Sequence, residues 1–297
     1  MSQKSLLLLW KITSLKLSKY MEKRSYIVCC ICKNERKYIK EFVEYHLDLG
    51  FDKIIIGDNN DVNGETYDEI LADNIECGEV EIVNLRGQVA KQMPFYNDII
   101  HNYNYEWCAF IDCDEFLTFA EGSKFDNIKD FLDSNNKIKA YAVNWMVYGD
   151  NERVFAGEGD VVDRFKKPMP FTFKFHYNFP EDYHIKSILH KDVQANFISC
   201  PHNVNGYTNY YSPDGTALMK TSPFNPNMDF NVLYIRHFYT KSLEEWVNKK
   251  MKNKHADCKP SDLPVYYPIS DFFIYNRVTD AKLNYLKKNG IQYTKKL

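Results

Sequence analysis

Strand patterns alternate with helical repeats in the first half of the chain. Strands are predicted at Tyr26–Cys32, Lys53–Gly57, Val80–Asn84, Trp107–Ile111 and Ala140–Val147, and the first is apolar throughout, as in strands buried on both faces. Helices are predicted between them, from Ile39 to a stop at Gly50, at Thr66–Asn74, at Gln88–Tyr103 and after a cap at Asp126. This alternation predicts an α/β domain with a mostly parallel central sheet and helices on both faces.

The alternation ends after about Tyr148, and the pattern there predicts loops rich in aromatic residues, histidine and proline. Helices return at Ser242, where Ser242 and Glu245 form a capping box, and near Thr279–Lys288. The chain is therefore predicted to contain an N-terminal extension (1–24), an α/β domain (25–241) and a small C-terminal helical extension (242–297).

Three polar clusters each follow a predicted strand. They are Lys33–Glu35, Asp58–Asp61 and Asp112–Glu115. Ligands of such sheets bind outside the carboxyl ends of the strands, so these clusters are expected to meet at one rim. Asp112 and Asp114 can share one face and hold a hard divalent cation, which would neutralise a diphosphate leaving group. Taken alone, the two carboxylates are more typical of a solvated turn, but their position directly after the apolar strand Trp107–Ile111 favours a binding site.

Composition and charge exclude several classes of protein. The 297 residues are 44% hydrophobic and include 12 Gly and 11 Pro, which excludes a disordered chain, a collagen or a coiled coil. A net charge of −2 argues against nucleic acid as a partner. Leu6–Leu9 and nearby lysines leave peripheral membrane contact open, although a loose extension is the simpler interpretation. The eight cysteines are interpreted as free thiols, because Cys29 and Cys32 would point to opposite faces of a strand.

The loop after the first predicted strand also excludes some kinds of site. Lys33–Arg36 contains no glycine-rich phosphate loop, and the chain has no P-loop and no G-x-S-x-G motif. A nucleotidyltransferase or phosphotransferase, which also places aspartates at a strand end, would be expected to carry a Gly- and Lys-rich loop here. That alternative is therefore kept second, together with a non-catalytic nucleotide-sugar-binding protein.

Several motifs follow one another along the chain. They are I-C-K-N-E-R-K-Y-I-K-E-F-V-E-Y-H (31–46), Ala109–Phe116, Val143–Trp145 with Gly149, Arg164-Phe165, Lys186-Ser187 and His237–Ser242. In this order, over roughly Tyr26 to Lys250, they are similar to glycosyltransferase family 92 and to nucleotide-sugar glycosyltransferases of the GT-A fold. The resemblance implies an inverting enzyme that uses a UDP-sugar, with UDP-galactose as the favoured donor.

The resemblance also implies residues for the metal and the donor. A Mn²⁺ or Mg²⁺ ion would be held by Asp112, Asp114 and His237, although Asp112 also suits the ribose and His237 also fits a core histidine. The expected donor-binding residues are Ile31, Lys33, Asn34, Glu35, Asp58, Arg86, Gln92, Asn97, Asp112 and Cys113. Tyr96 is a further candidate, with an amphipathic helix as its alternative, and Arg86 is either a phosphate ligand or a loop charge.

On the acceptor side, the resemblance points to Trp145, Gly149, Lys186 and His202, with Arg164 as a further cation, and the metal is the alternative ligand of His202. Trp145 also fits a core position, and Arg164 and Lys186 also fit ion pairs. Inversion needs a general base for the acceptor hydroxyl. Asp163 is the first candidate and Asp150 the second, and Glu158, Glu181 and Asp182 stay open.

These observations lead us to expect a metal-dependent glycosyltransferase. It would move a sugar, galactose by resemblance, from a UDP-sugar to a glycan or lipid-linked oligosaccharide acceptor in the synthesis of a bacterial surface polysaccharide. The expected location is the cytoplasm, with the inner face of the membrane left open.

Overall fold

The computed structural model describes residues 25–169, 175–176, 179–220, 222–252, 254–256 and 267–293. The predicted N-terminal extension and its proposed membrane contact lie outside these residues, as does Cys258. Within the described ranges, no helix has the length and apolar character needed to cross a membrane.

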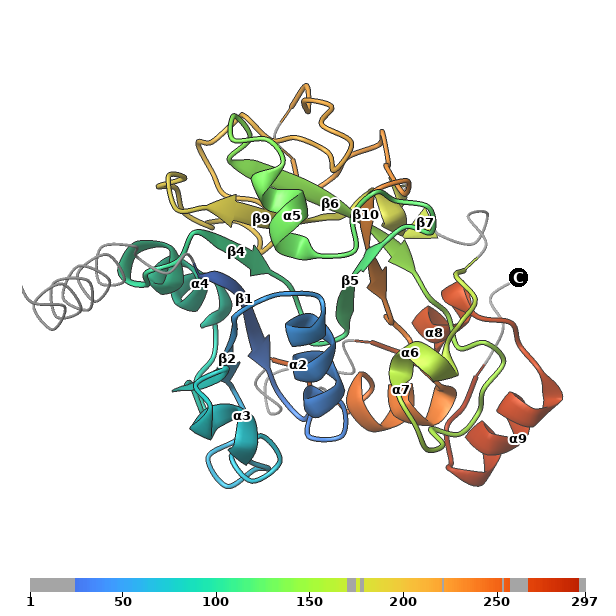
Figure 1. Cartoon of the computed structure of the whole chain (residues 1–297). Coiled ribbons are helices and arrows are strands. Elements are labelled where there is room, and N and C mark those ends of the chain that lie inside the picture. The colour runs from blue at the N-terminus through green and yellow to red at the C-terminus, as the bar shows by residue number, and fades with distance from the viewer. Residues whose placement is uncertain are drawn as a thin grey trace, which may run out of the picture.

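An eight-stranded sheet forms the centre of the fold, in the order β3-β2-β1-β4-β9-β6-β10-β5 (Figure 1). The strands are β1 (Tyr26–Cys32), β2 (Lys53–Asp58), β3 (Val80–Asn84), β4 (Trp107–Phe110), β5 (Glu115–Phe119), β6 (Ala140–Val147), β9 (Ile185–His190) and β10 (Leu233–His237). Neighbours from β3 to β4 are parallel, as are β6 and β10, whereas β9 and β5 run antiparallel to their neighbours. The predicted mostly parallel α/β sheet is confirmed.

The two faces of the sheet have separate hydrophobic cores. Val28, Cys30 and Cys32 of β1 belong to one core, and Ile27, Cys29 and Ile31 belong to the other. Helices α2 (Ile39–Asp48) and α5 (Ile128–Asp133) pack into the first core, and α4 (Gln92–Asn102) packs into the second. Helices therefore cover both faces, as predicted, and Cys29 and Cys32 point to opposite sides.

The predictions differ from the structure in several places. Helix α3 is Ala72–Glu76, shorter and later than predicted, and Asn127 rather than Asp126 caps α5, because its side chain accepts the Lys129 N–H. The prediction of loops alone after Tyr148 was wrong, because β9 and β10 lie inside the sheet. The same region also contains α6 (Val161–Arg164), β7 (Phe175–His176), β8 (Phe179–Pro180) and a 3-10 turn at Glu181–Tyr183.

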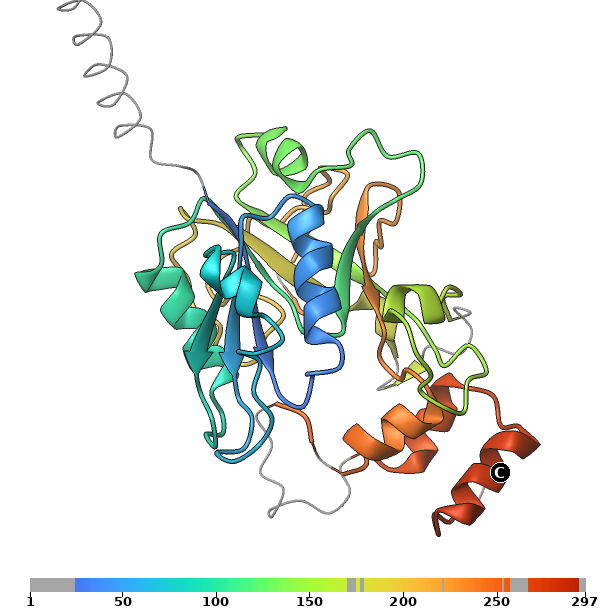
Figure 2. The same ribbon diagram turned by 60° about the horizontal axis from the view of Figure 1, so that its bottom comes forward.

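Three C-terminal helices form a third, smaller core. They are α7 (Leu243–Lys249), α8 (Ile269–Tyr275) and α9 (Asp280–Lys288), and they lie together on one side of the sheet (Figures 1 and 2). The core contains Leu243, Trp246, Val247, Ile269, Phe272 and Leu286. The capping box of Ser242 and Glu245 is present as predicted. A separate helical group agrees with the predicted extension, while the domain boundaries themselves stay predictions.

Candidate active site

One pocket of about 260 Å³ lies where the carboxyl ends of β1, β4, β6 and β10 meet. Ten of the predicted site residues line it: Ile31, Lys33, Glu35, Gln92, Asp112, Cys113, Asp114, Trp145, His202 and His237. The parallel strands bring these residues together from distant parts of the sequence, because their carboxyl ends share one edge of the sheet.

Asp112 is held in place by two neighbours. Gln92 Nε2 donates a hydrogen bond to Asp112 Oδ1 at 3.0 Å, and the Lys186 ammonium lies 2.6 Å from Asp112 Oδ2. Lys186 is fully buried in the sheet and also lies 3.6 Å from the buried carboxylate of Glu115. Of the two interpretations of Lys186, the ion pair is therefore the one that the structure contains.

Asp114 and His237 lie side by side. His237 Nε2 is 3.7 Å from Asp114 Oδ1, and Lys241 Nζ is 3.8 Å from Asp114 Oδ2. The antiparallel pairing of β5 with β10 places His237 opposite Glu115, and the Phe238 N–H donates to the Asp114 carbonyl oxygen at 2.9 Å. The strand register therefore fixes the histidine beside the second aspartate.

The charge states of this pair follow from their surroundings. Burial favours protonation of Asp114, but the Lys241 ammonium opposes it, and the pKa of the carboxyl falls to about 2. Burial lowers the pKa of His237 to about 3, against the opposite effect of Asp114. Near neutral pH the pair consists of a carboxylate and a neutral imidazole.

A carboxylate beside a neutral imidazole suits a divalent cation. The described residues contain no cluster of three or more His, Cys, Asp or Glu side chains that could hold a metal ion. Mg²⁺, however, is usually bound by one or two protein carboxylates together with phosphate and water oxygens. His237 Nδ1 is buried and has no hydrogen-bond partner among the described residues, so this imidazole is only partly satisfied. Asp114 and His237 therefore fit the expected ion, whereas both oxygens of Asp112 already have partners.

Aromatic rings form one wall of the pocket. The Trp145 ring lies 4.2 Å from that of His237, 5.3 Å from that of His202, and stacks on His184 at 4.6 Å. His202 is held through its Nδ1, 2.9 Å from the Ile185 carbonyl oxygen, and through its own carbonyl, which accepts from Ser187 Oγ at 2.6 Å. Trp145 and His202 therefore line the pocket, and Trp145 is also part of the first hydrophobic core.

The sequence was also compared with known proteins. The model of the family described as Glycosyltransferase family 92 matches residues 24–255, most of the chain. This chain belongs to glycosyltransferase family 92. The family predicted from the ordered motifs is thereby confirmed.

Individual relatives of this family 92 chain are distant. A glycosyltransferase family 92 protein of Ricinus communis is 26% identical over 129 residues, which cover 41% of this chain and 22% of that protein. The match thus spans about a fifth of the relative. Solved structures include S. aureus TarS in complex with UDP-GlcNAc (12% identity, 74% of this chain, 60% of that chain, TM-score 0.38). Another similar structure is the mannosyltransferase PcManGT from Pyrobaculum calidifontis in complex with GDP-Man and Mn²⁺. It is 10% identical, and the match covers 41% of this chain and 36% of that chain with a TM-score of 0.29.

Some predicted donor-binding residues do not line the described pocket and instead bind other parts of the chain. Arg86 forms an ion pair with Asp58 at 2.6 Å and donates to carbonyl oxygens of the loop at residues 61–65. Asn34 Nδ2 donates to the Lys254 carbonyl oxygen at 3.1 Å, and Asn97 binds the backbone of Phe197. Direct donor contacts by these residues stay predictions. Tyr96 is fully buried, with its ring packed against Phe110 and Phe197, rather than on a solvent face.

The predicted general bases are not among the described residues that line the pocket. Asp163 is 71% exposed and lies 3.3 Å from Lys166, and Asp150 is buried in an ion pair with Lys282. Of the other candidate bases, Glu158 is exposed, Glu181 accepts a hydrogen bond from Tyr275 Oη, and Asp182 accepts one from the Val147 N–H. Gly149, predicted on the acceptor side, packs against Asn276. The structure brings none of these carboxylates to the pocket, and the identity of the base stays a prediction.

One side of the pocket was not predicted from the sequence. Tyr239, Lys249, Lys250, His255, Ala256 and Tyr267 also line it. Tyr239 follows β10, the two lysines end α7, His255 and Ala256 come soon after it, and Tyr267 lies just before α8. The only sequence signal was the pair of lysines in the last turn of a helix that directly follows a family motif.

Proposed function

We propose that this chain is a metal-dependent glycosyltransferase that moves a sugar from a UDP-sugar to a glycan or lipid-linked acceptor with inversion. One observation carries the proposal: Asp114 and His237 lie together in a pocket at the carboxyl ends of the strands, next to Asp112. Membership of glycosyltransferase family 92 supports it. Galactose as the transferred sugar rests on the family resemblance, as does a role in bacterial surface polysaccharide synthesis at the inner face of the membrane.

The donor would lie between two groups of residues. Ile31, Lys33 and Glu35 at the end of β1 would bind the nucleoside, and Gln92 holds Asp112 in position for the ribose. Mn²⁺ or Mg²⁺, held by Asp114 and His237, would offset the negative charge of the diphosphate. Trp145 also lines the pocket, where it would contact the transferred sugar.

Acceptor binding would use the wall formed by Trp145 and His202. His202 donates its Nδ1 proton to the Ile185 carbonyl, which leaves Nε2 as an acceptor for a hydroxyl group. The ring is held at both its backbone and its side chain, so it would orient an acceptor with little loss of side-chain freedom.

The test is release of UDP from UDP-galactose, UDP-glucose and UDP-N-acetylglucosamine, with water or added glycans as acceptor. We expect release from at least one donor with Mn²⁺, none with EDTA, and a loss of at least about a hundredfold in Asp114→Asn. The exposed carboxylate of Asp130 provides the matched control Asp130→Asn, which should keep full activity. Metal-independent release, or full activity of Asp114→Asn, would contradict the proposal.

A further inference from the structure

Four lysines in or beside the pocket are each matched by a carboxylate. Their partners are Asp61 for Lys33 (2.8 Å), Asp112 for Lys186 (2.6 Å), Asp114 for Lys241 (3.8 Å) and Glu35 for Lys249. Each of these positive charges is therefore offset within the protein, and none of the four is a free cation for a ligand.

Lys250 differs from these four. It lines the pocket, and no carboxylate of the described chain lies within ion-pair distance of its ammonium. The Lys250 Nζ instead lies 4.7 Å from the ring centroid of Tyr239 and 5.4 Å from that of Tyr267, and both rings line the same pocket. Asp114 acts on the ammonium only from beyond ion-pair distance, and aromatic faces attract a cation without neutralising it, so Lys250 can still attract an anion.

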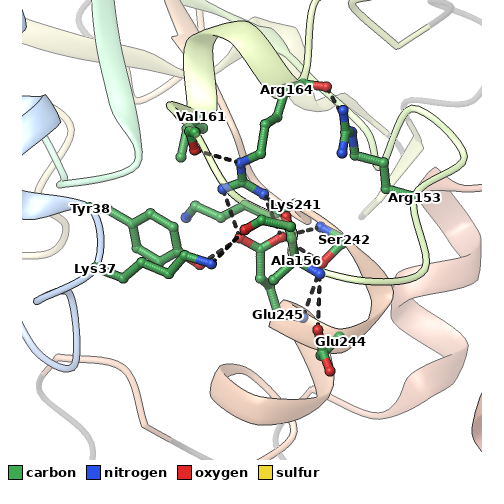
Figure 3. Close-up of polar contacts among 12 residues, drawn as sticks. Lys37, Tyr38, Arg153, Ala156, Val161, Arg164, Lys241, Ser242, Glu244 and Glu245 are labelled. Carbon is green, nitrogen blue, oxygen red and sulfur yellow. Dashed lines mark hydrogen bonds and ion pairs between the residues drawn. The ribbon is translucent and has the colours of Figure 1, made fainter.

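The backbone of Lys250 is fixed by the helix that it ends. Its N–H donates to the Trp246 carbonyl oxygen, and Trp246 is fully buried. At the start of the same helix, Glu245 accepts from Ser242 in the capping box and pairs with Arg164 at 3.0 Å (Figure 3). The helix therefore holds the ammonium at the pocket.

The geometry points to Lys250 as the residue that binds the donor diphosphate beside Asp114 and His237. This inference rests on the proposed function and adds the residue that receives the leaving group. As the acceptor oxygen bonds to the anomeric carbon and its proton passes to the base, the bond from the sugar to the diphosphate breaks and its electron pair stays with UDP. An ammonium in a partly buried pocket stabilises that added negative charge. Because a lysine side chain donates to phosphate as a point charge, it suits either phosphate group.

The experiment compares UDP with UMP by isothermal titration calorimetry in Mn²⁺, on wild type, Lys250→Met and Lys250→Arg. UDP carries more negative charge than UMP, so Lys250→Met should weaken UDP binding by about tenfold or more and UMP binding by clearly less. Lys250→Arg should keep most of the affinity for UDP. Pyrophosphate should displace UDP from the wild type and require a much higher concentration in Lys250→Met.

Lys252→Met is the matched control, because Lys252 lies two residues further on, is exposed and does not line the described pocket. It should bind both nucleotides as the wild type does. Equal losses for UDP and UMP in Lys250→Met, or no loss, would overturn the inference while leaving the proposed function intact. A wild type that binds neither nucleotide would overturn both. Lys250→Arg keeps the positive charge and provides a second test if Lys250→Met does not fold. A folded Lys250→Arg variant that binds UDP tenfold more weakly would contradict a role based on charge alone.

Discussion

Arg164 on α6 and Glu245 on α7 form a buried ion pair, with 3.0 Å between Nη2 and Oε1. Their side chains are 3% and 8% exposed, and Tyr38 Oη donates to the same carboxylate (Figure 3). Burial alone would raise the pKa of Glu245, but the hydrogen bonds from Arg164, Ser242 and Tyr38 lower it to about 2. This ion pair joins the sheet domain to the helix that carries Lys250, so Arg164 acts here as a structural cation.

Removing one partner of this pair should strongly destabilise the protein. In Arg164→Met or Glu245→Gln the other charged or polar group stays buried without its partner, which costs about 3–5 kcal/mol of unfolding free energy. Urea unfolding followed by circular dichroism measures the loss. The exposed pair of Lys166 with Asp163 provides the control, since Lys166→Met should have almost no effect. If all three variants lost similar amounts of unfolding free energy, burial would not explain the contribution of the pair of Arg164 with Glu245.

Buried His46 should make the stability depend on pH. Its Nδ1 donates to the Phe42 carbonyl oxygen at 2.8 Å, and its Nε2 accepts the Leu117 N–H at 3.3 Å, so the folded state requires the neutral ring. Burial lowers the pKa of His46 from 6.5 to about 4. The unfolded chain therefore binds the proton more readily, and stability should fall as the pH drops from 6.5 towards 4, by up to about 1.4 kcal/mol per pH unit.

Unfolding free energies measured between pH 7.5 and 4.5 check this expectation. His46→Gln removes the titrating group, so its stability should vary less with pH than that of the wild type over this range. His101→Gln, at an exposed histidine on α4, should keep the dependence of the wild type. A His46→Gln profile parallel to that of the wild type would show that His46 is not the source of the dependence.

Asn97 should control the order of the loop that carries His202. Its Nδ2 donates to the Phe197 carbonyl oxygen at 3.0 Å, and its Oδ1 accepts the Phe197 N–H at 2.8 Å. Asn97→Ala should cost roughly 1–3 kcal/mol and speed hydrogen exchange around residues 195–203. Asn102→Ala, which removes an exposed contact of the same helix with Asp98, is the control. Unchanged exchange in Asn97→Ala would contradict the role of these two bonds.

The sequence predicts the first half of the sheet well for a physical reason. Strands such as Tyr26–Cys32 are apolar on both faces and end at polar clusters, so their position and the rim that they form are visible locally. β9 and β10 carry Lys186, Ser187 and His237 at buried positions, which breaks the apolar pattern. Lys186 and Ser187 bind residues far away in sequence, as in the pair of Lys186 with Asp112, and no local pattern records such a partner.

The site residues differ in the same way: those marked by local motifs were predicted, and those placed by the folded chain were not. Asp112, Asp114 and His237 are predicted from a strand end and from ordered family motifs, and the structure brings all three to one pocket. Lys250 and Tyr239 were missed, because a lysine at the end of an amphipathic helix resembles any solvated charge. Only the return of α7 to the sheet shows that this lysine faces the pocket rather than water.

The most direct test of the account is a thermal-shift titration of UDP, GDP and dTDP, each with Mn²⁺ or EDTA, on wild type, Asp114→Asn and the control Asp130→Asn. A ligand at a hundred times its dissociation constant adds about 2.7 kcal/mol of stability, which is readily detected. UDP with Mn²⁺ should stabilise the wild type and Asp130→Asn, and the shift should disappear with EDTA and in Asp114→Asn. No shift of the folded wild type with any nucleotide, or an equal UDP shift in Asp114→Asn, would contradict it.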